Sequence, residues 1–373
     1  MSDITLVLLA AGSSSRFELD AKKQWLRIGH KPLWQFVADN FAQTGLFAKI
    51  IITASEDDFD FMDYYASYTY VLGGATRQQS LKNTLHEIKT PYVLVSDIAR
   101  SCIDEVFLQK IIAQKDTSDC IVPYLHASDT IVYDNTTIDR ERVKLIQTPQ
   151  LSFTSTLKKA LQTKEEFTDE SSAIVAIGGT RSFILGNPSA HKITYIYDLQ
   201  KVPCLVPPSS DTLVGTGFDV HAFDTKGAMV LGGVAIESKF GFLAHSDGDV
   251  ALHALIDALL GAAGLGDIGM LFPDNDVNYK GADSKELLRK VVQKIYNYGF
   301  VIVNADITIA AQTPRLSPYK LQMRHAIASL LHIESSRVNI KATTTEKLGF
   351  IGRSEGVGVI ANVSLKYFDW TKI

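Results

Sequence analysis

The chain has 373 residues, of which 46% are hydrophobic and 21% are charged, so it can bury sizeable cores and carries no signature of disorder. A chain of this length is expected to form two domains. The formal net charge of −4 excludes a global basic field of the kind that binds nucleic acid. Anionic substrates must therefore meet local clusters of cations, such as Arg16, Lys22, Lys23 and Arg27.

The cysteines argue against a disulfide framework and against a thiolate zinc site, because they are widely separated and form no CxxC pair. They are Cys102, Cys120 and Cys204. The apolar run at residues 4–11 has the length of a strand and follows no basic segment, which excludes a signal peptide. The apolar helix expected near 250–263 contains His253 and Asp257, which argues against a membrane span. The sequence predicts a soluble cytoplasmic protein.

The first half of the chain, residues 1–200, alternates short β-rich runs with helical patterns. A helix is expected over Pro32–Thr44, since it begins at a proline and ends near Gly45. Such alternation predicts right-handed βαβ units and a mostly parallel sheet covered on both faces. The expected strands are Ile4–Ala10, Lys49–Thr53, Tyr68–Leu72, Tyr92–Ser96 and Asp119–Pro123.

A seam at about 201–211 separates the two halves. Three of the 11 prolines lie there, followed by polar turn residues, which is typical of a semi-extended linker. We therefore predict domains over 1–208 and 209–373. In the second half, strands are expected at 214–221, 301–311, 338–343 and 356–366, and helices at 249–263, 284–298 and 318–331.

A loop of small residues, Gly12–Ser15, follows the first expected strand. Ligands of open α/β sheets bind at this edge, where exposed backbone N–H groups can cradle phosphates. The loop is neither a Walker A loop nor a GxGxxG loop. Arg16 and Lys23 can clamp a triphosphate here, and Asp97, at the end of another strand, is placed to hold Mg²⁺.

The second half contains a candidate metal site. Asp219 and His221 lie two residues apart on an expected strand and therefore point to the same face. His253 and Asp257 share one stripe of the next expected helix. Asp219, His221 and His253 can converge on a divalent metal and leave a position open for a substrate oxygen, as in catalytic zinc sites. The alternative is an ion-pairing helix face beside a core histidine, but an unpaired charge in an apolar helix would be costly, which favours the metal.

The N-terminal segments together resemble the 2-C-methyl-D-erythritol 4-phosphate cytidylyltransferases of the non-mevalonate isoprenoid pathway, over roughly residues 4–200. The matching motifs are Leu8–Arg16, Lys22–Gln24, Gly73–Ser80, Ser96–Arg100, Asp139–Arg140, Thr148–Gln150, Thr168–Ser171 and Lys192–Thr194. The sequence departs from the family at Ser14, where glycine is usual, and at Lys22 and Ser101, where proline is common. The resemblance implies a Rossmann-like nucleotidyltransferase domain that transfers CMP from CTP and releases pyrophosphate.

This resemblance also implies roles for individual residues. Arg16 and Lys23 would neutralise charge on the α-phosphate, Arg140 and Lys192 would position the sugar-phosphate nucleophile, and Asp97 would hold Mg²⁺ or Mn²⁺. Substrate contacts are expected at Gly12, Gly74, Ser80, Arg100, Thr130, Thr148 and Thr168.

The C-terminal half resembles the 2-C-methyl-D-erythritol 2,4-cyclodiphosphate synthases, almost unbroken from Gly217 to Leu365. The motifs are Phe218–His221, Ala244–Asp249, Gly266–Gly269, Leu271–Asp274 and Lys341–Phe350. The resemblance implies a smaller α/β domain that closes the cyclic diphosphate and expels CMP. It assigns zinc to Asp219, His221 and His253, a second cation such as Mg²⁺ to Glu346, and orientation of the diphosphate to His245 and Thr344. The implied substrate contacts are Ser246, Asp257, Asp267, Gly269, Asp274, Thr343, Phe350 and Arg353.

The two resemblances also imply partners. The cyclase family is homotrimeric with active sites between subunits, and the cytidylyltransferase family commonly dimerises, so a chain with both interfaces closes as a D₃ hexamer. The phosphorylation between the two reactions needs a separate ATP-dependent kinase, because the chain has no Walker A loop. Small molecules are the expected ligands, and neither nucleic acid nor membrane is.

Three alternatives compete with this reading. One carboxylate and two histidines also describe the facial triad of non-haem iron oxygenases, although that explains none of the phosphate-directed residues. One half could be a non-catalytic scaffold, which would predict loss of Lys23 or His253, and both are present. The N-terminal half could act on another sugar-alcohol phosphate, such as ribitol phosphate, but fusion to the cyclase favours a shared pathway.

Overall fold

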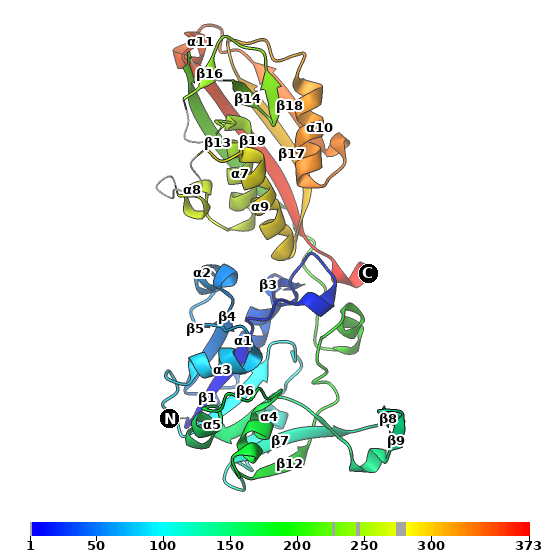
Figure 1. The fold of residues 1–373 in the computed structure, drawn as a ribbon. Helices are drawn as coiled ribbons and strands as arrows, with labels where there is room; N and C mark the ends of the chain where they lie inside the picture. The colour runs from blue at the N-terminus through cyan, green and yellow to red at the C-terminus, as the bar shows by residue number, and fades with distance from the viewer. Residues whose placement is uncertain (1, 226–227, 244–246, 274–280) are drawn as a thin grey trace. The chain divides into compact units, whose positions relative to one another are not determined.

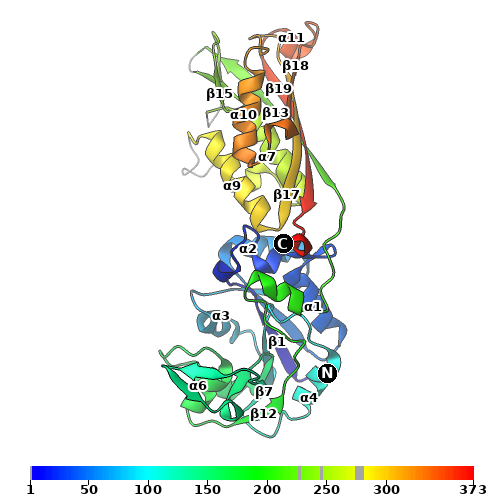
Figure 2. The ribbon, with the colours of Figure 1, turned by 90° about the vertical axis from the view of Figure 1, so that its right-hand side faces the viewer.

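The structure is a computed structural model that describes residues 2–225, 228–243, 247–273 and 281–373. Its contacts divide the chain into two compact units, Met1–Pro207 and Pro208–Ile373. The first unit is coloured blue to green and the second green to red in Figure 1 and, from a second direction, in Figure 2. Across the described ranges, no helix has the length and apolarity that crossing a lipid bilayer requires.

The first unit contains an eight-stranded sheet in the order β10-β7-β11-β6-β1-β4-β5, with β12 paired to β7. Strands β6, β1, β4 and β5 are parallel to one another, whereas β11 and β10 are antiparallel to their neighbours. Residues of β1 and β6 are almost all buried, as apolar runs covered on both faces should be. The strands are β1 (Ile4–Leu9), β4 (Lys49–Ala54), β5 (Thr69–Leu72), β6 (Tyr92–Asp97), β7 (Cys120–His126), β10 (Lys144–Ile146), β11 (Gln150–Phe153) and β12 (Arg181–Leu185).

Helices pack on this sheet, and two hairpins leave it. One core cluster joins the sheet residues Val7 and Val95 to Leu157 and Ile174 of the helices. The helices are α1 (Leu33–Gln43), α2 (Glu56–Tyr65), α3 (Arg77–Thr84), α4 (Glu105–Ile112), α5 (Thr154–Ala160) and α6 (Glu170–Ala176). The hairpins are β2–β3 (Arg27–Ile28 and Lys31–Pro32) and β8–β9 (Ile131–Tyr133 and Thr136–Ile138). The β8–β9 hairpin projects well away from the sheet (Figure 1).

The predicted α/β class and mostly parallel sheet are confirmed. The five predicted strands of the first half correspond to β1, β4, β5, β6 and β7, and the helix predicted over Pro32–Thr44 corresponds to α1. The antiparallel strands β10 and β11 were not predicted, because they are short runs between turn residues.

The prediction against a disulfide framework did not anticipate one bonded pair. Cys102 and Cys204 are bonded although 102 residues separate them in the chain, while Cys120 is free and buried. The chain returns past the loop after β6, where Ile193 N–H donates to the carbonyl of Ala99. Two cysteines that lie far apart in the sequence therefore meet in the folded unit.

The second unit is built on a five-stranded sheet in the order β16-β13-β19-β17-β18, antiparallel except between β17 and β18. The strands are β13 (Leu213–Asp224), β16 (Gly241–Phe242), β17 (Phe300–Ala310), β18 (Val338–Thr343) and β19 (Gly356–Tyr367), with a separate hairpin β14–β15 (Met229–Leu231 and Val234–Ile236). The helices are α7 (Val250–Ala263), α8 (Ile268–Leu271), α9 (Ser284–Asn297), α10 (Lys320–Leu331) and α11 (Gly349–Gly352). The long elements match those predicted for this half.

Helix α7 lies unusually close to β13, and glycine makes this possible. A Cβ atom on Gly217 would lie 1.9 Å from the carbonyl oxygen of Ala254, which no side chain can accommodate. The opposite face of the same sheet carries exposed apolar residues, namely Val214 at 68%, Phe218 at 63% and Ile360 at 44% exposure. An apolar sheet face of this kind is typical of a surface that another protein surface covers.

Candidate active sites

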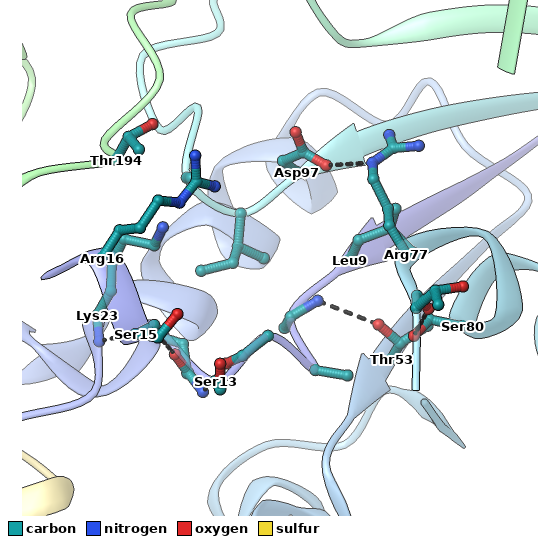
Figure 3. A pocket seen from close by; sticks show the side chains of 18 of the residues that line it. Leu9, Ser13, Ser15, Arg16, Lys23, Thr53, Arg77, Ser80, Asp97 and Thr194 are labelled. Carbon is teal, nitrogen blue, oxygen red and sulfur yellow. Dashed lines mark hydrogen bonds and ion pairs between the residues drawn. The ribbon is translucent and has the colours of Figure 1, made fainter. Parts of the chain in front are cut away.

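The first unit has a cavity of about 420 Å³ at the carboxyl ends of β1 and β6. The loop of residues 10–16 forms one wall, and the start of α3 and residues 192–194 form others. Figure 3 shows Arg16, Lys23 and Thr194 on one side of this cavity, with Asp97, Arg77 and Ser80 on the other. The cavity therefore lies at the sheet edge where the sequence predicted a phosphate-binding loop.

Ser14 adopts the conformation that usually favours glycine. Its φ is 58°, in the left-handed region. Its hydroxyl donates to Oε1 of Gln24 at 2.9 Å and accepts from the backbone N–H of Lys23 at 3.2 Å. Serine therefore keeps the turn of the loop and joins it directly to the segment that carries Lys23.

Lys23 extends from this segment to the wall formed by residues 192–194, on the same side of the cavity. Its ammonium donates to the carbonyl of Ile193 at 2.8 Å. Burial, together with the positive charge of Lys192, lowers the pKa of Lys23 to about 8. A bound triphosphate would offset both effects, so the site is poised to take up negative charge.

Asp97 is held between two cations at the end of β6. Its Oδ1 accepts from Nε of Arg77 at 3.1 Å and its Oδ2 from Nζ of Lys192 at 2.6 Å. Burial acts to raise the pKa of Asp97, but Arg77 and Lys192 outweigh it and the pKa is lowered well below its usual range. The carboxylate therefore stays ionised, as a Mg²⁺ ligand must be.

Arg77 is in turn fixed by a fully buried carboxylate. Both of its terminal nitrogens donate to the carboxylate of Glu170 at the start of α6, and one of these contacts is 2.5 Å long. Burial raises the pKa of Glu170, while Arg77 opposes the shift. Arg77 and Glu170 both lie in segments that carry the family motifs, but neither was singled out, because no spacing rule joins residues so far apart in the chain.

The other predicted substrate residues of this unit fall into two groups. Gly12, Gly74 and Ser80 line the cavity, and the Ser80 hydroxyl accepts from the backbone N–H of Gly74 at 3.0 Å. The residues outside the cavity lining are Arg100, Thr130, Arg140, Thr148 and Thr168. Thr148 and Arg100 support the site from behind, since Thr148 accepts from the backbone N–H of Asp97 and Arg100 donates to the carbonyl of Ala190.

Thr130 and Arg140 flank the projecting β8–β9 hairpin and are exposed. Nη1 of Arg140 donates to the carbonyl of Ser128 at 2.8 Å, within the same arm. Thr168 is also exposed, just before α6. The cavity of one chain thus gathers Arg16, Lys23, Asp97 and Lys192 but not Arg140.

The second unit brings Asp219, His221 and His253 together, and among the described residues they form the one group suited to a metal ion. Oδ2 of Asp219 is 3.2 Å from Nε2 of His221 and 3.3 Å from Nδ1 of His253. Burial acts to raise the pKa of Asp219, but the two histidines outweigh it and the pKa is lowered. One carboxylate oxygen and two ring nitrogens that face each other fit a tetrahedral divalent metal with an open position.

Hydrogen bonds fix both histidines on the side away from Asp219. Nδ1 of His221 is 2.9 Å from the carbonyl oxygen of Gly248. Nε2 of His253 is 2.9 Å from the hydroxyl of Ser284. Asp257, predicted to share a helix stripe with His253, makes a different contact. Its carboxylate instead accepts from the backbone N–H of Ile268 at 2.8 Å, and burial raises its pKa.

The remaining predicted residues of this unit lie at or just after the end of β18, in or beside α8, and in or beside α11. Thr343 ends β18, and the Thr344 hydroxyl donates to Glu346 at 3.1 Å; Glu346 has a φ of 51°. Asp267 caps α8, which contains Gly269, and Phe350 lies in α11. Arg353 pairs with Glu355 at 2.8 Å. His245, Ser246 and Asp274 lie outside the described residues.

Comparison with protein families matches one family to each unit. Residues 4–206 match the family described as 2-C-methyl-D-erythritol 4-phosphate cytidylyltransferase, IspD. Residues 212–366 match the YgbB family. The first match contains the cavity beside Asp97, and the second contains the group Asp219, His221 and His253.

Relatives match over both units at once. The chain is 72% identical to a bifunctional enzyme IspD/IspF of Sulfurimonas denitrificans, over 99% of this chain and 96% of the relative. It is 56% identical to another of Sulfurovum sp., over 99% of both chains. The solved structure of the bifunctional IspDF from Campylobacter jejuni is 46% identical, covers 99% of this chain and 100% of its own, and superposes with a TM-score of 0.91.

Proposed function

The chain belongs to the bifunctional IspD/IspF family, and from that premise we propose which of its residues carry the two reactions. It is an enzyme of isoprenoid biosynthesis with a cytidylyltransferase domain and a cyclodiphosphate synthase domain. One observation carries the residue assignment: each family match coincides with one structural unit, and each unit contains one site with the charges its reaction needs.

In the N-terminal cavity, an oxygen of methylerythritol phosphate would attack the α-phosphorus of CTP, and the bond to the leaving pyrophosphate would break. Arg16 and Lys23 would stabilise the charge that develops on the phosphates, and Lys192 would position the nucleophile. Gly12, Gly74 and Ser80 would receive the nucleotide, because their small side chains leave the backbone open to it. The Ser14 conformation supports this assignment, since it preserves the phosphate loop.

In the C-terminal site, the terminal phosphate of 4-diphosphocytidyl-methylerythritol 2-phosphate would attack the inner phosphorus, closing the ring and releasing CMP. Thr344 and the predicted His245 would orient the diphosphate, and tethering within one molecule supplies proximity. Asp257, Asp267 and Gly269 would lie around the sugar. Substrate contacts are also proposed for Ser246, Asp274, Thr343, Phe350 and Arg353.

We propose zinc as the ion at Asp219, His221 and His253, because two nitrogen donors with one carboxylate favour it over Mg²⁺. Bound zinc would supply a Lewis acid for a phosphate oxygen. Mg²⁺ or Mn²⁺ is proposed at Asp97 and Glu346, which offer oxygen donors only. Asp97 must release Lys192 to accept the ion, and Lys192 would then be available to the substrate phosphate.

We propose domain limits of 1–208 and 209–373. The break in contacts after Pro207 and the gap between the family matches support them. Fragments cut there should each fold and keep one activity. Loss of folding in both fragments would contradict the proposal.

We propose a D₃ hexamer as the assembly. The exposed apolar face of β13 and β19 suits a threefold interface in the second unit, and the projecting β8–β9 arm suits a twofold exchange in the first. A second copy would also bring Arg140 to a cavity that lacks it within one chain. Light scattering that gives a monomer would contradict this assembly.

A separate kinase is proposed to act between the two reactions, because the product of the first lacks the phosphate that attacks in the second. The test of the whole function uses purified enzyme in two assays. CTP, Mg²⁺ and methylerythritol phosphate should release pyrophosphate, and the phosphorylated cytidine-diphospho intermediate with zinc should release CMP. Formation of the cyclic diphosphate from methylerythritol phosphate, CTP and ATP by this chain alone would exclude the separate kinase.

A further inference from the structure

We propose that Ser284 and Asp247 form a hydrogen-bonded chain that sets the tautomer of His253, so that its Nδ1 presents a lone pair to the metal. Ser284 and Asp247 would be positioning residues, acting through His253. The inference rests on the proposed function in one respect, namely that Asp219, His221 and His253 bind a metal.

Three side chains from three separate segments make the chain of contacts. His253 on α7 has Nδ1 3.3 Å from Asp219 and Nε2 2.9 Å from the Ser284 hydroxyl oxygen. The same hydroxyl lies 2.5 Å from Oδ1 of Asp247, which also accepts from the backbone N–H of Ser284 at 3.3 Å. Ser284 is fully buried, so water does not compete for these bonds.

The direction of each bond follows from what each group can donate. An ionised carboxylate only accepts, so the single hydroxyl proton of Ser284 goes to Asp247. The Ser284 oxygen then has only lone pairs left for the ring, and Nε2 of His253 must be the donor. An imidazole that binds a metal ion is neutral and carries one N–H, so with Nε2 as the donor Nδ1 keeps a lone pair for the ion.

In His221 the two ring nitrogens have the opposite roles, and it is Nε2 that presents a lone pair to the metal. Its Nδ1 faces the carbonyl of Gly248, which only accepts, so Nδ1 carries the proton and Nε2 presents its lone pair toward Asp219. The two rings therefore direct Nε2 and Nδ1, respectively, at one point beside Asp219. His221 is oriented by the backbone, whereas His253 depends on a side chain that a substitution can remove.

A purely structural role for Ser284 is a poorer explanation of the same contacts. Serine at the start of a helix commonly serves as its cap, but here Asp283 is the N-cap of α9 and accepts from the backbone N–H of Lys285 at 2.8 Å. The Ser284 hydroxyl is thus not used for capping. Supporting hydrogen bonds of this kind typically contribute about 10- to 100-fold to metal affinity.

The test measures zinc affinity by competition with a chromophoric chelator, using the full-length enzyme stripped of metal. Ser284→Ala should weaken zinc binding by about 10- to 100-fold. Ser284→Thr keeps the hydroxyl and should stay close to wild type. Asp247→Asn should weaken zinc binding in the same direction but less, because its neutral amide oxygen accepts more weakly than a carboxylate and its N–H groups can reverse the bond to Ser284. Ser329→Ala, an exposed serine on α10 of the same unit, is the matched control and should have no effect.

The outcomes separate this inference from the proposed function. If His253→Ala loses zinc while Ser284→Ala binds it as tightly as wild type, the positioning role is wrong and the metal site stands. If Ser284→Ala does not fold, Asp247→Asn decides, and wild-type affinity in that variant overturns the inference. If wild-type enzyme binds no zinc at this site, the proposed metal site fails first and the inference fails with it.

Discussion

The two sites differ in how their charged groups are brought together. The proposed metal site of the second unit takes all three candidate ligands from one strand, β13, and the helix α7 that packs against it. The cavity of the first unit takes its charges from the loop after β1, the segment of Lys23, the start of α3, the end of β6 and residues 192–194, and Glu170 of α6 holds Arg77 from behind. The first arrangement is nearly local, while the second depends on the whole sheet.

This difference has a consequence for what each site tolerates. Asp219, His221 and His253 depend on the closeness of β13 and α7, which Gly215 and Gly217 permit. The cavity instead depends on opposite charges that balance one another, because Asp97 is held by Arg77 and Lys192 and Arg77 by Glu170. Substitutions in the first should therefore act through the metal, and substitutions in the second through charge.

The largest effect expected is that of His253→Ala. It removes one of three ligands and should abolish zinc retention and CMP release, while pyrophosphate release from CTP stays nearly intact because that site lies in the other unit. Metal analysis and both assays measure this, with His325→Ala, an exposed histidine on α10, as the control. Equal loss of both activities in well-folded protein would contradict the separation of the two sites.

Lys23→Ala should give the converse result. A cation that stabilises a phosphoryl transition state contributes several kcal/mol, so pyrophosphate release should fall by more than about 100-fold. CMP release and zinc content should not change. Lys110→Ala, on the exposed face of α4, controls for loss of a positive charge. Normal pyrophosphate release in Lys23→Ala would remove Lys23 from the catalytic site.

A smaller effect is expected for Glu170→Gln, which removes the buried charge behind Arg77. Arg77 keeps Asp97 as a partner but loses its own orientation, so kcat/KM for CTP should fall by about tenfold, or 1.4 kcal/mol. Breaking a buried ion pair should also destabilise the first unit by about 3 kcal/mol. If Arg77 then competes with Mg²⁺ for the Asp97 carboxylate, raising the Mg²⁺ concentration should restore part of the activity. Glu56→Gln, an exposed residue of α2, should change neither quantity.

The same contrast explains how much of each site the sequence could predict. The two-residue period of a strand predicted that Asp219 and His221 share a face, and the structure brings His253 of α7 beside them. Ser284 and Glu170 were missed because their partners lie in distant segments, and no local rule relates them. The pairing of Cys102 with Cys204 was missed for the same reason. The long strands and helices were predictable because burial and periodicity repeat along them, whereas β10 and β11 are too short to show a period.

The smallest effect expected is a change in a pH profile, and it depends on one residue of the cavity. The pKa of Lys23 is lowered to about 8, first by burial and then by the charge of Lys192. The ammonium is present below this pH and is lost as pH rises through it, so kcat/KM for CTP, which reports the free enzyme, should decline above about pH 8. Lys23→Arg keeps its charge throughout this range, because the arginine pKa exceeds about 12, and any activity it retains should not show the decline.

CMP release by the same protein should lack this transition, since Lys23 belongs to the other unit. A fall at the same pH in wild type and in Lys23→Arg would mean that another group titrates there, and would leave the cavity's charge balance without the role assigned to Lys23.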